Sequence, residues 1–217
     1  MSEPQGHVTG EDGVADERCR WETVGSEQRF DGAIIEVRTD RVRMPHGEKS
    51  EVVARDVVVH PGSVGVICLD DEERVLLLRQ YRHPIGYLLW EPPAGLRDVE
   101  GEPLWRTAAR ELAEEAGYRA REWHTLLDAC TSPGMTNERT RIFLARGLSE
   151  ISAGEDDFER IHEEADMPIA WVPLDDAVAT VQRGAVHNPL AVMGILAVYA
   201  ARAAGFRDLR APDAPEW

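Results

Sequence analysis

The chain has 217 residues, of which 43% are hydrophobic, so it can bury the core of one domain with an added segment. Its 40 acidic and 24 basic residues give a net charge of −16, which disfavours nucleic-acid partners because their backbones bind basic surfaces. A phosphorylated small molecule remains compatible with this charge if divalent cations lie between ligand and protein.

Targeting and redox signals are also informative. The sequence contains no run of 18 apolar residues, so we expect no membrane span, and its acidic N-terminus does not resemble a signal peptide. The three cysteines, Cys19, Cys68 and Cys130, are far apart in the sequence, which favours reduced thiols in a cytoplasmic protein.

The predicted elements begin after a polar segment, residues 1–18, which we expect to be disordered. Residues 19–60 are expected to form a β-strand segment, with strands over 29–42 and 51–60. An acidic turn at 70–73 predicts a hairpin between the strands expected at 64–69 and 75–79. Apolar runs bounded by turn residues predict further strands at 64–69, 75–79, 87–90, 123–129, 141–145 and 169–172.

Helical periodicity appears in three places. Residues 103–116 have apolar side chains on one face, a proline in the first turn and Gly117 as a stop. Two more helices are expected at 174–182 and 189–204. Strands and helices alternate without βαβ regularity, which favours an α+β domain over 61–205 with a mixed sheet flanked by helices. Residues 206–217 are expected to be a loose tail.

The sharpest feature is the sequence RELAEEAGY at residues 110–118. On a helix, Glu111 and Glu115 lie one turn apart with Glu114 beside them, and three carboxylates so placed repel one another. Mg²⁺ prefers oxygen ligands and would relieve this repulsion. The alternative is an exposed acidic helix face with no function.

Gly95, Glu102 and residues 110–118 together resemble the Nudix box. Seven residues separate Glu102 from Arg110, as that pattern requires, whereas six residues separate Gly95 from Glu102 where the pattern has five. The extra residue falls in the loop before the helix, so it should leave the helical carboxylates in place.

The resemblance implies an α/β/α sandwich preceded by the N-terminal β-sheet segment, and a Mg²⁺-dependent enzyme in which Mn²⁺ can substitute. Glu111 and Glu115 would be direct metal ligands, Glu114 a direct or water-mediated one, and the carbonyl of Ala94 a further ligand. Arg110 and Glu102 would hold the box in shape through a salt bridge and a loop contact.

Other segments resemble the ADP-ribose pyrophosphatase branch of that family. These are QYRHP at 80–84, LWEPPAG at 89–95, where Pro92 replaces the usual leucine, and Pro133, fifteen residues beyond Tyr118. The implied reaction is hydrolysis of ADP-ribose to AMP and ribose 5-phosphate. Alternatives are hydrolysis of another nucleoside diphosphate sugar and a non-catalytic sensor that binds ADP-ribose.

Further site residues follow from this resemblance. Glu138 matches the loop glutamate that activates the attacking water, and Glu163 or Glu164 is the alternative base or an extra metal ligand. Arg82 could pair with a phosphate, with Arg79 as the next candidate. Glu91 could accept ribose hydroxyls, and Met135, in the same loop as Glu138, is a further predicted substrate contact.

The predicted partners are a small nucleoside diphosphate sugar and a second copy of the chain. Related enzymes exchange their N-terminal sheet across a two-fold interface, so residues 19–60 are expected to mediate a homodimer. The apolar run at 190–200 could add to that interface.

Overall fold

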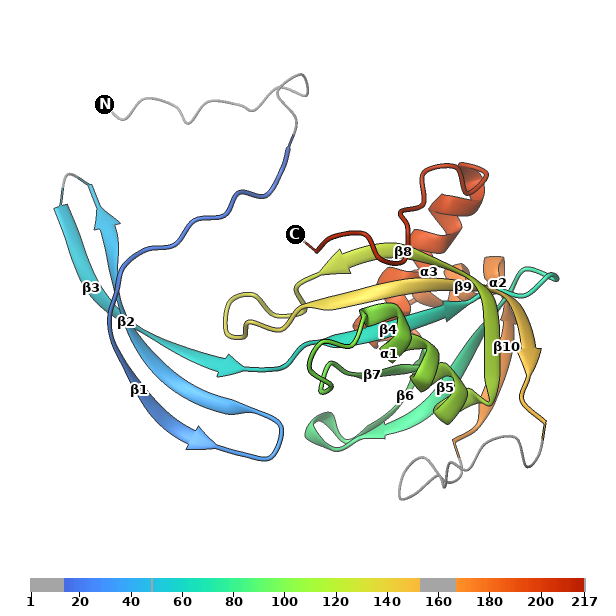
Figure 1. The fold of residues 1–217 in the computed structure, drawn as a ribbon, viewed down its shortest axis with the longest axis horizontal. Helices are drawn as coiled ribbons and strands as arrows, with labels where there is room; N and C mark the ends of the chain where they lie inside the picture. Colours follow the sequence, from blue (N-terminus) through green and yellow to red (C-terminus); the bar gives the residue numbers. More distant parts are fainter. Residues whose placement is uncertain (1–13, 48, 153–166, 217) are drawn as a thin grey trace.

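The computed structural model describes residues 14–47, 49–152 and 167–216. Its ribbon shows a three-stranded sheet that stands apart from the body of the molecule (Figure 1). This sheet has the order β1-β2-β3 and is antiparallel throughout. Its strands are β1 (Thr23–Asp31), β2 (Glu36–His46) and β3 (Lys49–Val59).

One strand predicted in this segment is wrong in its extent. The sequence predicts a single strand over residues 29–42, whereas the chain turns between β1 and β2, where Gly32 N donates to the carbonyl of Ile35 at 3.0 Å. The apolar Ile34 in this turn is 58% exposed, so its hydrophobicity does not reflect burial within the described chain.

The body of the domain contains two further sheets. A four-stranded mixed sheet has the order β7-β4-β9-β8, in which β4 runs parallel to β9 and antiparallel to β7. The second sheet, β10-β5-β6, is antiparallel. The strands are β4 (Ser63–Cys68), β5 (Arg74–Arg82), β6 (Tyr87–Glu91), β7 (Ala94–Leu96), β8 (Tyr118–Ala129), β9 (Thr140–Glu150) and β10 (Ile169–Pro173).

The predicted hairpin between β4 and β5 is wrong. Both edges of β4 are occupied by β7 and β9, and β5 pairs with β6 and β10 in the other sheet. The acidic turn redirects the chain because the carboxylate of Asp70 accepts hydrogen bonds from the backbone N–H groups of Glu72 and Arg74. Only a bridge between Leu69 and Val75 links the two strands.

Helices cover both faces of the central strands. The helices are α1 (Leu104–Glu111), continued by the π-helical turn η2 (Leu112–Ala116), then α2 (Leu174–Gln182) and α3 (Pro189–Ala203); a short 3₁₀ turn, η1 (His83–Ile85), links β5 to β6. Val64 and Val66 of β4 pack in a cluster with Leu112 of the box helix, whereas Ile67 packs in a second cluster with Ile195 of α3. The expected α/β/α sandwich is therefore confirmed, and burial on both faces explains the unbroken apolar run of β4.

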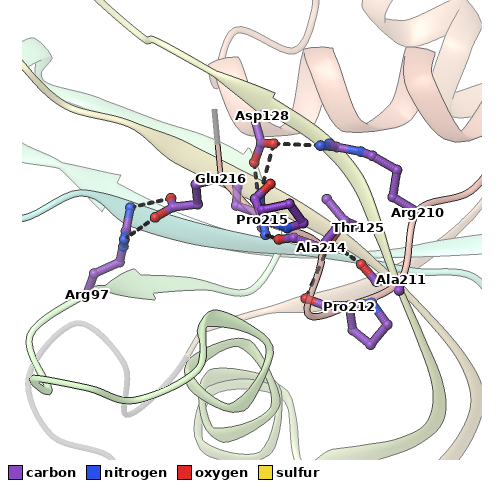
Figure 2. Close-up of polar contacts among 10 residues, drawn as sticks. Arg97, Thr125, Asp128, Arg210, Ala211, Pro212, Ala214, Pro215 and Glu216 are labelled. Carbon is purple, nitrogen blue, oxygen red and sulfur yellow. Dashed lines mark hydrogen bonds and ion pairs between the residues drawn. The ribbon is translucent and has the colours of Figure 1, made fainter.

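The C-terminal segment differs from the loose tail that the sequence predicts. After α3 it returns across β8 and β9, where its backbone carbonyls accept hydrogen bonds from Thr125 and Arg141 (Figure 2). Backbone contacts of this kind are invisible to composition, which is why a segment rich in Pro and Ala reads as loose.

None of the described helices has the length and apolar character needed to cross a bilayer.

Candidate active site

The box helix approaches β7 so closely that a side chain at one position of the strand would collide with a helical carboxylate. A Cβ added to Gly95 would lie 2.1 Å from both Cδ and Oε1 of Glu111, well inside van der Waals contact. The loop strand and the helical carboxylate can therefore meet only because Gly95 has no side chain.

Glu115 is held by the same short strand. Its Oε2 accepts a hydrogen bond of 2.8 Å from the backbone N–H of Ala94, and the residue is only 8% exposed. The interpretation of the acidic cluster as a solvated helix face is thus wrong for Glu115. The π-helical turn that contains Glu114 and Glu115 is a distortion often found at functional sites.

Arg110 supplies the local positive charge. Its guanidinium lies 2.8 Å from Glu111, 3.2 Å from Glu114, 3.6 Å from Asp98 and 3.8 Å from Glu102. Burial acts to lower the pKa of Arg110, but Glu111 and Glu114 raise it overall, so the guanidinium stays charged. One cation among four carboxylates leaves the cluster with excess negative charge.

The excess negative charge affects the pKa of Glu111. Burial raises its pKa to about 7, and the neighbouring Glu114 adds to the shift, while Arg110 opposes it. A carboxylate whose charge is this unfavourable gains strongly from a nearby cation. Glu102 accepts a 2.8 Å hydrogen bond from the Thr107 hydroxyl, and this bond attaches the end of the loop to the helix.

The oxygen atoms of these carboxylates are suitable ligands for a divalent cation, although the side chains are not arranged around a metal site in this structure. Within residues 14–47, 49–152 and 167–216, no three acidic, His or Cys side chains converge as a ligand set. Glu111 and Glu114 contact Arg110 instead, and Glu115 contacts Ala94. An oxygen-rich, partly buried and under-compensated donor set is nonetheless what a hard divalent cation prefers.

Glu138 lies on the same cavity as the box loop. Its carboxylate accepts hydrogen bonds from the hydroxyls of Ser63, at 3.1 Å, and Thr131. The cavity wall combines polar and apolar side chains from β4, β5, β6, β7 and the N-terminal end of α3. The residues that line it are His60, Ser63, Arg82, Glu91, Ala94, Gly95, Leu96, Glu138, Asn188 and Leu190.

Arg82 and Glu91 face this cavity as a pair. Arg82 Nε lies 2.9 Å from Glu91 Oε1, and its Nη2 lies 2.5 Å from Oε2, while Glu91 is only 3% exposed. The sequence assigns these residues separate contacts with substrate, but the structure shows Glu91 orienting Arg82 on the cavity wall.

Two other predicted substrate contacts lie elsewhere. Side chains alternate along a strand, so Arg79 and Arg82 of β5 point to opposite faces, and Arg79 instead lies over the ring of Trp90, 5.8 Å from its centroid. Met135 is 59% exposed, and its carbonyl accepts a hydrogen bond from Val58 N. Neither residue belongs to the described lining of the cavity. Glu163 and Glu164 lie outside the described residues.

Sequence reasoning missed several polar residues around the cavity. Ser63 and Thr131 hold Glu138, yet they lie 75 and 7 residues from it with no motif linking them. His60 Nδ1 accepts the backbone N–H of Gly62 at 3.0 Å, so its 3.8 Å approach to Glu138 is no hydrogen bond. Asn188 was detectable as a helix cap before Pro189, and its Oδ1 accepts from Ala191 N at 3.0 Å.

Comparison with known proteins agrees with this geometry. Residues 59–190, more than half of the chain, match the NUDIX domain family, and the chain belongs to this family. Its members generally use a divalent metal ion.

Relatives make the comparison more specific. The chain is 45% identical to the ADP-ribose pyrophosphatase of Mycobacterium tuberculosis over 91% of both chains. It is 33% identical to the methanol dehydrogenase activator of Bacillus methanolicus over 80% of this chain and 89% of that one. A crystal structure of an ADP compounds hydrolase has the same fold, with a TM-score of 0.68 at 19% identity, covering 88% of this chain and 99% of that one.

The close approach at Gly95 gives a direct prediction. Gly95→Ala should displace the flexible end of Glu111 rather than the backbone, so the melting temperature should change little while hydrolytic activity falls by roughly 10²-fold. Gly25→Ala is the control, because an added methyl there meets nothing within 4 Å. Equal activity of the two variants would show that the position of Glu111 is unimportant.

Proposed function

We propose that this protein hydrolyses the diphosphate of ADP-ribose to AMP and ribose 5-phosphate, with Mg²⁺ as its natural cofactor and Mn²⁺ as a substitute. The observation that carries the proposal is the cavity shared by the box loop at Ala94 and Gly95 and by Glu138. The 45% identity to an ADP-ribose pyrophosphatase supports the choice of substrate. The reaction adds water to one phosphorus and breaks its bond to the bridging oxygen.

Glu111 and Glu115 would hold the metal directly, Glu114 directly or through water, and the Ala94 carbonyl would complete the set. When bound, the metal neutralises the diphosphate and lowers the pKa of an attacking water. Arg110 and Glu102 hold the carboxylates in position through the contacts described above. Arg110 therefore has a positioning role rather than a chemical one.

Glu138 is the proposed general base. Its two hydroxyl donors, Ser63 and Thr131, fix the orientation of its carboxylate on the cavity wall. The hydrogen bonds to its carboxylate come from these two hydroxyls, so it would be able to accept a proton while the box glutamates bind metal. Glu163 or Glu164 is the alternative base.

Arg82 is the proposed contact for a substrate phosphate. Its charge lies on the cavity wall, and the buried Glu91 fixes its orientation through two carboxylate oxygens. Glu91 would thus position Arg82 in addition to any contact with ribose. Arg79 and Met135, which do not line this cavity, stay predicted substrate contacts.

We also propose a homodimer formed through residues 19–60. A lone three-stranded sheet has little core of its own, and this one carries large exposed apolar side chains. These are Trp21, Val24, Phe30 and Ile34. Association through the sheet would bury them.

We also propose that the protein is located in the cytoplasm. Cys19, Cys68 and Cys130 are all free thiols, and burial raises the pKa of Cys68 far above its ordinary value, which makes that thiol unreactive.

The first test is product analysis with ADP-ribose and Mg²⁺. We expect equimolar AMP and ribose 5-phosphate, and no turnover in excess chelator. Glu115→Gln should keep an acceptor for Ala94 N and therefore the fold, but lose most activity because an amide is a weaker metal ligand.

Other outcomes of this assay separate the alternatives. Faster turnover of another nucleoside diphosphate sugar would change the proposed substrate and leave the proposed site residues unchanged. Tight binding of ADP-ribose without products would favour the sensor, and full turnover in chelator would contradict the metal mechanism.

A second test concerns the base. Glu138→Gln keeps the side-chain shape but cannot accept a proton, so kcat should fall roughly 10²–10⁴-fold with little change in KM. Steady-state kinetics of Glu138→Gln, Glu163→Gln and Glu164→Gln would locate the base. An active Glu138→Gln beside an inactive variant at 163 or 164 would move the assignment to the later segment.

The third test is the mass in solution. Light scattering should give twice the chain mass of 24.2 kDa at micromolar concentration. Phe30→Asp should shift the mass toward the monomer, because a charge is costly to bury at an apolar interface. A wild-type protein that stays at the chain mass would contradict the dimer.

A further inference from the structure

The C-terminal segment is bound along its length to β8 and β9. The backbone N–H of Thr125 donates to the carbonyl of Arg210 at 3.0 Å, and its hydroxyl donates to the carbonyl of Ala211 at 3.0 Å. Thr125 is only 1% exposed, so these bonds close over a buried polar residue. The segment therefore behaves as part of the folded domain.

A buried arginine anchors the segment further on. Arg141 of β9 is 3% exposed, and its guanidinium donates to the carbonyls of Ala214, at 2.6 Å, and Pro215, at 3.2 Å. The same guanidinium pairs with Asp128, which also accepts from Arg210 at 2.9 Å. Burial acts to raise the pKa of Asp128, but these two arginines lower it overall.

This anchor is costly to open. A buried guanidinium needs acceptors for its N–H groups, and releasing the C-terminal carbonyls would leave some of them unpaired. The backbone next to residue 216 is consequently fixed on the sheet.

The fixed end reaches the box loop. Glu216 forms a bidentate pair with Arg97, in which Nη1 and Nη2 lie 2.8 Å and 2.9 Å from the two carboxylate oxygens (Figure 2). Arg97 directly follows β7 and lies two residues after Gly95. Its backbone N–H also donates to the carbonyl of Gly62 at 3.1 Å.

Gly62 shows how tightly the Arg97 side chain is placed. A Cβ added to Gly62 would lie 2.9 Å from Arg97 Cδ and 2.9 Å from the carbonyl oxygen of Arg139. The side chain of Arg97 thus passes beside the segment before β4, close to the residue that follows Glu138.

We propose that Glu216 and Arg97 are positioning residues for the metal-binding loop, with the C-terminal segment holding the exit of β7 in place. The inference rests on the proposed metal site. This loop, residues 97–103, forms neither strand nor helix and contains the one residue beyond the usual box spacing, and Arg110 and Thr107 hold its later residues, Asp98 and Glu102, against the helix. The Arg97–Glu216 pair restrains the first residue of the loop and, through it, the approach of Gly95 to Glu111.

The pair should affect metal binding far more than global stability. Partly exposed ion pairs contribute little to unfolding free energy, and the side chains of Arg97 and Glu216 are 23% and 34% exposed. Residues that orient a metal site from outside it typically change metal affinity by roughly 10–100-fold.

The test measures Mn²⁺ binding by electron paramagnetic resonance, together with the Mg²⁺ concentration for half-maximal activity and the melting temperature. Glu216→Ala and Arg97→Ala should each weaken both metal responses about 10-fold or more. The reversed pair, Arg97→Glu with Glu216→Arg, should recover much of this loss. A purely structural role would not give such rescue of metal affinity.

Arg202→Ala is the matched control. Its side chain is 22% exposed and pairs with Glu73 and Asp175 far from the box, so metal binding should be unchanged. Normal metal affinity in the Glu216 and Arg97 variants would overturn the positioning role while leaving the proposed function intact. A wild-type protein that binds no Mn²⁺ would overturn both.

Discussion

The proposed site depends on a contact that only a residue without a side chain permits. Gly95 lets the backbone of β7 lie against Glu111, and the adjacent Ala94 N–H then reaches the buried carboxylate of Glu115. This hydrogen bond satisfies a partly buried backbone donor and directs the Glu115 carboxylate toward the loop. Loop and helix are thereby joined at the residues where a metal would bind.

The same contact concentrates negative charge. Arg110 balances only part of the charge of Glu111, Glu114, Asp98 and Glu102, and burial raises the pKa of Glu111 to about 7. Residual repulsion of this kind destabilises the protein alone but favours the capture of a cation. The cavity beside it adds Glu138 and the Arg82–Glu91 pair, which provide a base and a phosphate contact.

Sequence reasoning located the parts of this site that depend on local patterns. Helical spacing placed Glu111, Glu114 and Glu115 together, and apolar runs gave most strands and all three long helices. The site assignments themselves remain predictions about chemistry. The sandwich and the family membership are confirmed.

What sequence reasoning missed depends on long-range pairing. The partners of β4 are set by β7 and β9, so a local turn signal wrongly predicted a hairpin with β5. The position of Arg79 opposite Trp90 follows from strand register, which no motif specifies. The pairing of Glu91 with Arg82 depends on a side-chain contact along the strands that no motif specifies either. The C-terminal segment read as loose because its attachments are backbone carbonyls bound by the distant Arg141.

The central claim is that the strand–helix contact at Gly95 forms a divalent-cation site. The most direct measurement is the anomalous scattering of Mn²⁺ in crystals of the intact protein. We expect a peak bounded by Glu111, Glu115 and the carbonyl of Ala94, with Arg110 turned away from Glu111. A peak remote from these residues, or Mn²⁺-saturated crystals with no peak beside them, would contradict it.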